Sequence, residues 1–78
     1  MRTFRDHPVF FHPHAVDGME AEGLRVDDVL LAMELGSATP RRSGRSETFY
    51  PVGRKVILVR YDQMEDHVFV VSVSQRRR

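Results

Sequence analysis

Two segments in the second half of the chain are rich in β-branched and other apolar residues, and the two faces that each would form at the two-residue period of a β-strand differ in polarity. They are residues 55–61 and 67–74, and the polar stretch 62–66 between them predicts a hairpin loop. Residues 47–52 form a third such strand, and Gly53 marks a turn or bulge. In residues 67–74 this two-residue alternation predicts that Phe69, Val71 and Val73 face the core. In residues 55–61 it places Ile57, Val59 and Tyr61 on one face and Val56, Leu58 and Arg60 on the other.

The first half of the chain follows a helical spacing instead. Residues 14–22 predict a helix that ends at Gly23, and residues 27–35 predict a second helix, with Asp27 as its N-cap and Gly36 as its end. Before them, residues 8–12 predict an edge strand, because prolines cannot donate hydrogen bonds to a sheet. Residues 36–46 predict a loop rich in Gly, Ser and Pro.

These elements fit into one domain. Seventy-eight residues leave no room for a second core, and residues 1–7 and 76–78 are expected to be flexible ends. The predicted fold is an α+β domain with element order β-α-α-β-β-β, in which a two-helix layer packs on an antiparallel sheet. The chain has no cysteine and no apolar run of the about 20 residues that a membrane span needs, and its first six residues lack the apolar stretch expected of a signal peptide. We therefore expect a cytoplasmic protein without disulfides, membrane contact or cofactor.

The acidic and basic residues are distributed unequally between the predicted helical first half and the predicted β-strand second half of the chain. Residues 1–39 carry three Lys or Arg against seven Asp and Glu, whereas residues 40–78 carry nine against four. A basic sheet beside an acidic helical layer is typical of a nucleic-acid-binding surface, because cations displace counterions from phosphates. The predicted nucleic-acid-binding residues are Arg41, Arg42, Arg45, Arg54, Lys55 and Arg76.

The chain also resembles a group of small bacterial proteins related to the RelE, ParE and BrnT toxins, over about residues 8–75. The residues that carry the resemblance are His14, Ala15, Met19, Gly23, Leu24, Asp28, Val29, Gly36, Gly53, the strand residues 56–59 and the closing residues 70–73. The sequence differs at Ser74, where BrnT-like chains carry Arg; here the arginines begin at Arg76.

This resemblance implies a RelE/BrnT-like fold and a bacterial toxin–antitoxin-like system. In such toxins a basic sheet face binds RNA on the ribosome, an antitoxin covers that face, and catalysis needs no metal. The resemblance thus implies RNA or the ribosome as one partner and an antitoxin as another.

Metal-free RNA cleavage needs a cation beside the phosphate and groups that transfer protons. Arg60 is the predicted cation, and Tyr61, His67 or Tyr50 would transfer protons. The catalytic hypothesis therefore rests on Arg60, Tyr61 and His67. The leading function is a toxin-type or toxin-derived RNA-interacting protein of a bacterial toxin–antitoxin-like system, whose enzymatic form would be a metal-free, ribosome-dependent endoribonuclease.

Two other interpretations of the same sequence remain open. His12 and His14 form a His-x-His pair that can ligate zinc, but no spacing selects a third ligand, so a structural role at the helix start is favoured over a metal site. The acidic residues of the first half are expected to be a solvated helix face.

The alternative function is a non-catalytic protein-binding module or a homo-oligomer. It would use the sheet face or an unpaired strand edge. This alternative predicts sensitivity to changes at apolar surface positions such as Val68 and Val70.

Overall fold

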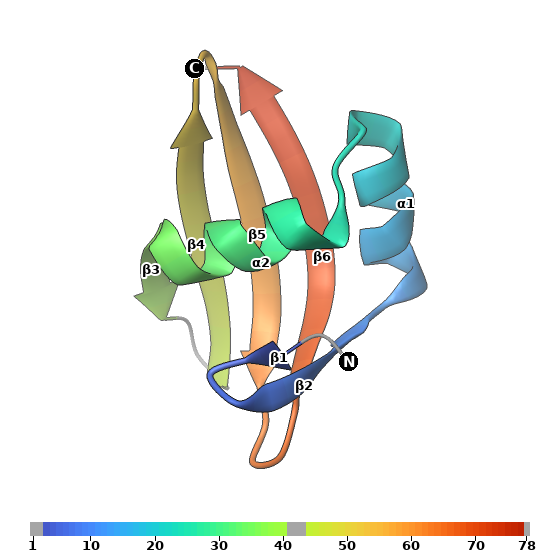
Figure 1. Ribbon diagram of the computed structural model, residues 1–78, viewed down its shortest axis with the longest axis vertical. Coiled ribbons are helices and arrows are strands. Elements are labelled where there is room, and N and C mark those ends of the chain that lie inside the picture. The colour runs from blue at the N-terminus through green and yellow to red at the C-terminus, as the bar shows by residue number, and fades with distance from the viewer. Residues whose placement is uncertain (1–2, 41–43, 78) are drawn as a thin grey trace.

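The computed structural model describes residues 3–40 and 44–77. Two helices pack against a six-stranded, curled, mixed sheet with strand order β1-β2-β6-β5-β4-β3 (Figure 1). In chain order the elements are β1 (Thr3–Phe4), β2 (His7–Phe11), α1 (Pro13–Glu22), α2 (Val26–Leu35), β3 (Ser37–Pro40), β4 (Arg45–Val52), β5 (Lys55–Gln63) and β6 (Val68–Arg77). The predicted α+β architecture with a helical layer is therefore confirmed.

One face of the sheet is covered and the other is not. In Figure 1, α2 crosses the near face of β4, β5 and β6, α1 lies beside β6, and the β1–β2 hairpin turns over the lower end of the same face. No described helix lies on the opposite face, which we call the open face. None of the described helices is long and apolar enough to cross a membrane.

The core lies between α2 and the covered face. Val59, Val68 and Val70 of the sheet are fully buried there, as are Val29 and Ala32 of α2. At the lower end the Phe4 ring meets the Tyr61 ring edge to face, with centroids 5.7 Å apart. Burial of these side chains stabilises the domain by removing apolar surface from water.

Both helices begin and end where local chemistry allows it. Gly23 adopts a left-handed conformation (φ 67°) and ends α1, as predicted. The predicted N-cap at Asp27 is wrong. The second helix begins at Val26, and the backbone N–H of Arg25 donates to Asp28 Oδ2 at 2.8 Å. Asp28 lies three residues after the N-cap residue Arg25, and this is the spacing at which a side chain accepts from the backbone N–H of the N-cap; Asp27 lies one residue too close.

The sheet departs from the prediction in three ways. It is mixed rather than purely antiparallel, because β2 pairs in parallel with β6. The predicted edge strand is interior, because β1, in the segment expected to be a flexible end, pairs with β2 outside it. The predicted loop contains β3, which pairs with β4 from Ser37 to Pro40. The β2–β6 pairing joins segments distant in sequence, so local composition did not reveal it. The β1–β2 and β3–β4 pairings are local, but the polar, Gly- and Pro-containing composition of these segments did not indicate strands.

The predicted core face of the last strand is also wrong at its start. Val68 and Val70 are fully buried, whereas Phe69 and Val71 are only partly buried. The cause is a β-bulge: Arg60 lies opposite Ser72 but Tyr61 lies opposite Val70, so Val71 has no partner. One extra residue reverses which positions face the core. Beyond the bulge Val73 is buried, as predicted.

Candidate nucleic-acid interface

Four cations gather at one end of the sheet, which we call the basic end. It consists of Arg54, Lys55, Arg76 and Arg77. The β4–β5 turn, where Gly53 has φ 60°, brings Arg54 and Lys55 beside the last residues of β6. All four residues are exposed, and none forms an ion pair or side-chain hydrogen bond with another described residue. The predicted residues Arg54, Lys55 and Arg76 are thus brought together, and Arg77 joins them.

The pairing at the basic end opposes like charges. Lys55 lies directly opposite Arg77 on the neighbouring antiparallel strand. Residues opposed in this way have Cβ atoms about 4.5–5.5 Å apart, and like charges there destabilise the sheet. An anion bound between them would remove that repulsion, so the arrangement favours a negatively charged ligand.

The other predicted RNA-binding arginines do not join the basic end. Arg45 lies at the opposite end of β4, about 20 Å away along the strand. Its Nε donates to Asp62 Oδ1 at 2.9 Å, and this bond and the nearby carboxylate raise the pKa of Arg45. Arg41 and Arg42 lie outside the described residues. Only half of the predicted set therefore belongs to this cluster.

Arg60 lies on the open face and is held by a residue that sequence reasoning did not select. Its Nε donates to Glu47 Oε2 at 2.6 Å. The Glu47 side chain is 8% exposed and that of Arg60 is 59% exposed. Glu47 therefore fixes the guanidinium, whose other N–H groups bond to no other described residue. Glu47 could have been found from the sequence only by predicting the β4–β5 register, which places Glu47 opposite Arg60.

The structure does not bring the three predicted catalytic residues together. Tyr61 is buried at 2% exposure on the covered face, opposite to the face that carries Arg60. His67 lies beyond the end of β5, where its Nδ1 is 2.7 Å from Asp66 Oδ1, an interaction that lowers the pKa of Asp66. Tyr50, the other candidate, is half-buried on the covered face beside Ile57.

The histidine pair has a structural role in α1. The backbone N–H of His14 donates to His12 Nδ1 at 2.9 Å, which caps the helix. Among residues 3–40 and 44–77, no three His, Asp or Glu side chains gather as a metal site would require. The zinc hypothesis thus finds no third ligand within that part of the chain.

The other residues that carry the family resemblance also build the fold. Ala15 is fully buried, Gly23 ends α1 and Gly53 forms the β4–β5 turn. At Gly36, a Cβ would lie 2.5 Å from both Ala32 O and Thr48 Cγ2, so a larger residue would push α2 from the sheet. With His14 at the start of α1, these residues have structural explanations.

Aromatic rings form a second feature of the open face. Phe10 of β2 is 55% exposed and lies directly opposite the partly buried Phe69 of β6. The His67 ring approaches Phe10 edge to face at 5.7 Å, and the His12 ring approaches Phe69 in the same way at 5.9 Å. Sequence reasoning missed this pair because it assigned Phe69 to the core.

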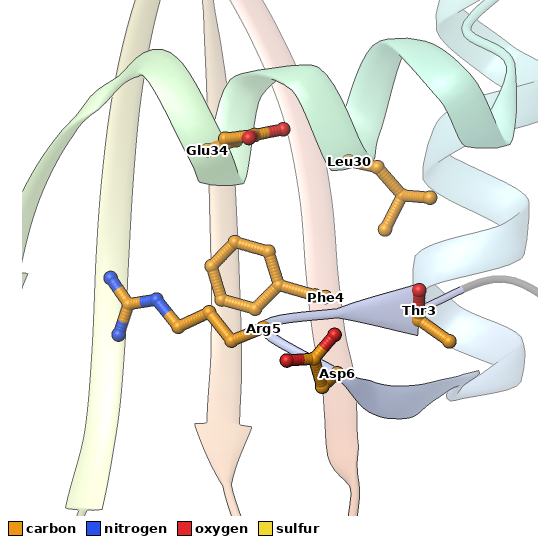
Figure 2. A pocket seen from close by; sticks show the side chains of 6 residues that line it. All are labelled: Thr3, Phe4, Arg5, Asp6, Leu30 and Glu34. Carbon is orange, nitrogen blue, oxygen red and sulfur yellow. The ribbon is translucent and has the colours of Figure 1, made fainter.

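A cavity of about 500 Å³ lies between the β1–β2 turn and α2. Figure 2 shows its lining residues Thr3, Phe4, Arg5, Asp6, Leu30 and Glu34. The Arg5 guanidinium points away from the carboxylates of Asp6 and Glu34, and it lies 5.0 Å from the centroid of the Phe4 ring. Two carboxylates against one guanidinium give the cavity lining a net negative charge, which disfavours phosphate binding there.

Comparison with known proteins adds no assignment. No protein-family model, curated protein or solved structure matches this chain.

Proposed function

We propose that this protein is an RNA-interacting protein of the toxin-derived kind, and that the basic end of its sheet binds the phosphate backbone of RNA. The observation that carries the proposal is the direct opposition of Lys55 and Arg77, flanked by Arg54 and Arg76, without an acidic partner among the described residues. The sequence resemblance to RelE- and BrnT-like toxins supports RNA, rather than another polyanion, as the ligand.

The proposed activity is binding rather than cleavage. A metal-free ribonuclease needs its cation and proton-transfer groups within reach of one phosphodiester. Here Tyr61 lies in the core, on the face opposite to Arg60, and His67 lies beyond the end of β5. The groups predicted for catalysis would therefore not act on one phosphate.

The test is a titration of a fluorescein-labelled single-stranded RNA by fluorescence anisotropy over a series of salt concentrations. Wild type should bind, and log K should fall linearly with log salt, because bound phosphates release counterions. Replacing Arg54, Lys55, Arg76 and Arg77 by Gln should weaken binding and reduce the slope by about one for each phosphate that the variant no longer neutralises.

The matched control is Arg45→Gln. Arg45 is also an exposed arginine, but it lies at the far end of β4, and both its Nε and its Nη2 already donate to Asp62. This variant should bind RNA nearly as wild type does. Wild-type protein that binds no RNA, or a fourfold variant with an unchanged salt slope, would refute the proposal.

Growth of a bacterial host addresses the toxin-derived part of the proposal. Induced wild type should slow growth and translation, and the fourfold Gln variant should relieve the effect while keeping its circular dichroism spectrum. Growth that is equally slow with both proteins would show that the basic end is not responsible.

A further inference from the structure

The open face carries a continuous row of side chains suited to a nucleic-acid strand. Along β6, the residues that share this face are Phe69, Ser72, Ser74 and Arg76, which lie opposite Asp62, Arg60, Leu58 and Val56 of β5. Phe10 extends the row onto β2. Aromatic rings thus lie at one end, hydroxyl groups in the middle and Arg76 of the basic end at the other.

We propose that this row is a track for single-stranded RNA, in which bases stack on Phe10 and Phe69 and the backbone runs past Arg60 towards Arg76. The inference rests on the proposed RNA binding and extends it, because it names the form of RNA and the groups that contact its bases. The track spans about 20 Å from Phe69 to Arg76, which is long enough for several nucleotides.

The aromatic end supplies a surface for bases. Phe10 exposes more than half of its surface although it lies on a sheet, and Phe69 lies directly across from it. The imidazoles of His67 and His12 meet these rings edge-on, with interplanar angles of 74° and 69°. Aromatic rings stack on any base, but only on bases that are not already stacked inside a duplex.

The remainder of the track suits a phosphate backbone. Arg60 is held by Glu47 through Nε, which leaves its other N–H groups without a described partner. A preoriented guanidinium is well suited to binding phosphate oxygens. The neighbouring Ser72 and Ser74 hydroxyls can donate to the same backbone.

Charge on the open face is compatible with this occupant. The carboxylates on this face of β4 and β5 are those of Glu47 and Asp62, and each is already paired with an arginine. The unpaired positive charge on this face therefore comes from Arg76, because Lys55 and Arg77 of the basic end alternate onto the other side of the sheet. This asymmetry favours an RNA strand over an acidic or neutral protein surface, because stacking and phosphate contacts are both available.

The test compares a labelled oligouridine with an RNA duplex of equal length, by anisotropy at one salt concentration. Wild type should prefer the single strand. Phe10→Leu, which keeps an apolar side chain but removes the ring, should weaken single-strand binding about tenfold and leave duplex binding unchanged. Leu35→Ala is the matched control, because Leu35 is 60% exposed on α2, away from the open face, and it should change neither affinity.

The salt dependence separates the two kinds of contact. Phe10→Leu should leave the slope of log K against log salt unchanged, whereas Arg76→Gln should reduce it by about one. Phe69→Leu, checked by circular dichroism because Phe69 is partly buried, should repeat the loss of affinity seen with Phe10→Leu.

Each contrary result has a distinct meaning. If wild type binds RNA but Phe10→Leu binds the single strand equally well, or if wild type prefers the duplex, the track is refuted and the proposed function stands. If wild type binds no RNA, both fail. If Phe10→Leu instead dissociates a dimer seen by light scattering and leaves RNA affinity intact, the open face belongs to a second copy of the chain and the track is refuted.

Discussion

Gly18 of α1 lies against the backbone of Val73 in β6, so close that a Cβ at position 18 would be 2.1 Å from the Val73 carbonyl oxygen. The helix touches the strand backbone there without an intervening side chain. Gly18 therefore sets the distance between α1 and the sheet.

Gly18→Ala should destabilise the protein by about 1–3 kcal/mol, because the methyl group must push the helix away from the strand. Helix propensity alone predicts the opposite sign, a gain of up to about 1 kcal/mol from replacing Gly by Ala inside a helix. Urea denaturation of the two proteins decides between them. A variant as stable as wild type, or more stable, would show that α1 does not contact β6 as described.

Lys55→Gln should stabilise the free protein by a few tenths of a kcal/mol while weakening RNA binding, because it removes the like charge opposite Arg77. Urea denaturation at low salt measures the gain, which should shrink as salt screens the repulsion. Lower stability at low salt would contradict the cross-strand repulsion.

Arg60→Ala should cost about 1–3 kcal/mol, because it takes the Arg60 hydrogen bond from a buried carboxylate. Arg45→Ala is the control: its partner Asp62 has a side chain 24% exposed against 8% for Glu47, so water replaces the missing hydrogen bond more easily. The measurement is again the free energy of unfolding. Equal losses of stability in the two variants would argue against a special role for Glu47 as the buried partner of Arg60.

Tyr61→Phe should leave RNA affinity unchanged, because the Tyr61 ring lies in the core on the covered face and contacts Phe4. Arg60→Gln, one position earlier on the open face, should weaken binding. Anisotropy with the labelled single strand compares the two. A loss of RNA affinity in Tyr61→Phe with an unchanged circular dichroism spectrum would show that the Tyr61 hydroxyl contributes to RNA binding.

Asp66→Asn should change how the free energy of unfolding depends on pH. The hydrogen bond from His67 lowers the pKa of Asp66 below its ordinary value of 3.8, so its stabilising contribution is complete above that value and is lost as pH falls through the lowered pKa. Between neutral pH and strong acid, wild type should therefore lose more stability than the variant. Parallel curves of unfolding free energy against pH would contradict the assignment. Because Asp66 is exposed, the difference should be small.

Local elements of this protein follow from its sequence alone. Gly23 ends α1 because glycine adopts the left-handed conformation without strain, and the alternation in β5 puts Ile57, Val59 and Tyr61, which are all buried, on one face. That same alternation already separates Arg60 from Tyr61, since neighbouring strand residues face opposite sides of a sheet. The sequence also indicated that the second half of the chain would carry the excess of positive charge.

Contacts between residues that are distant in sequence depend instead on the tertiary structure. The parallel pairing of β2 with β6 places Phe10 beside Phe69, and the pairing of β5 with β6 opposes Lys55 and Arg77. The bulge at Val71 reversed the buried face of β6, and the β4–β5 register joined Glu47 to Arg60. Strand register depends on side-chain packing summed over the whole sheet, whereas caps and alternation depend on a few adjacent residues, and so the candidate interface emerged only from the fold.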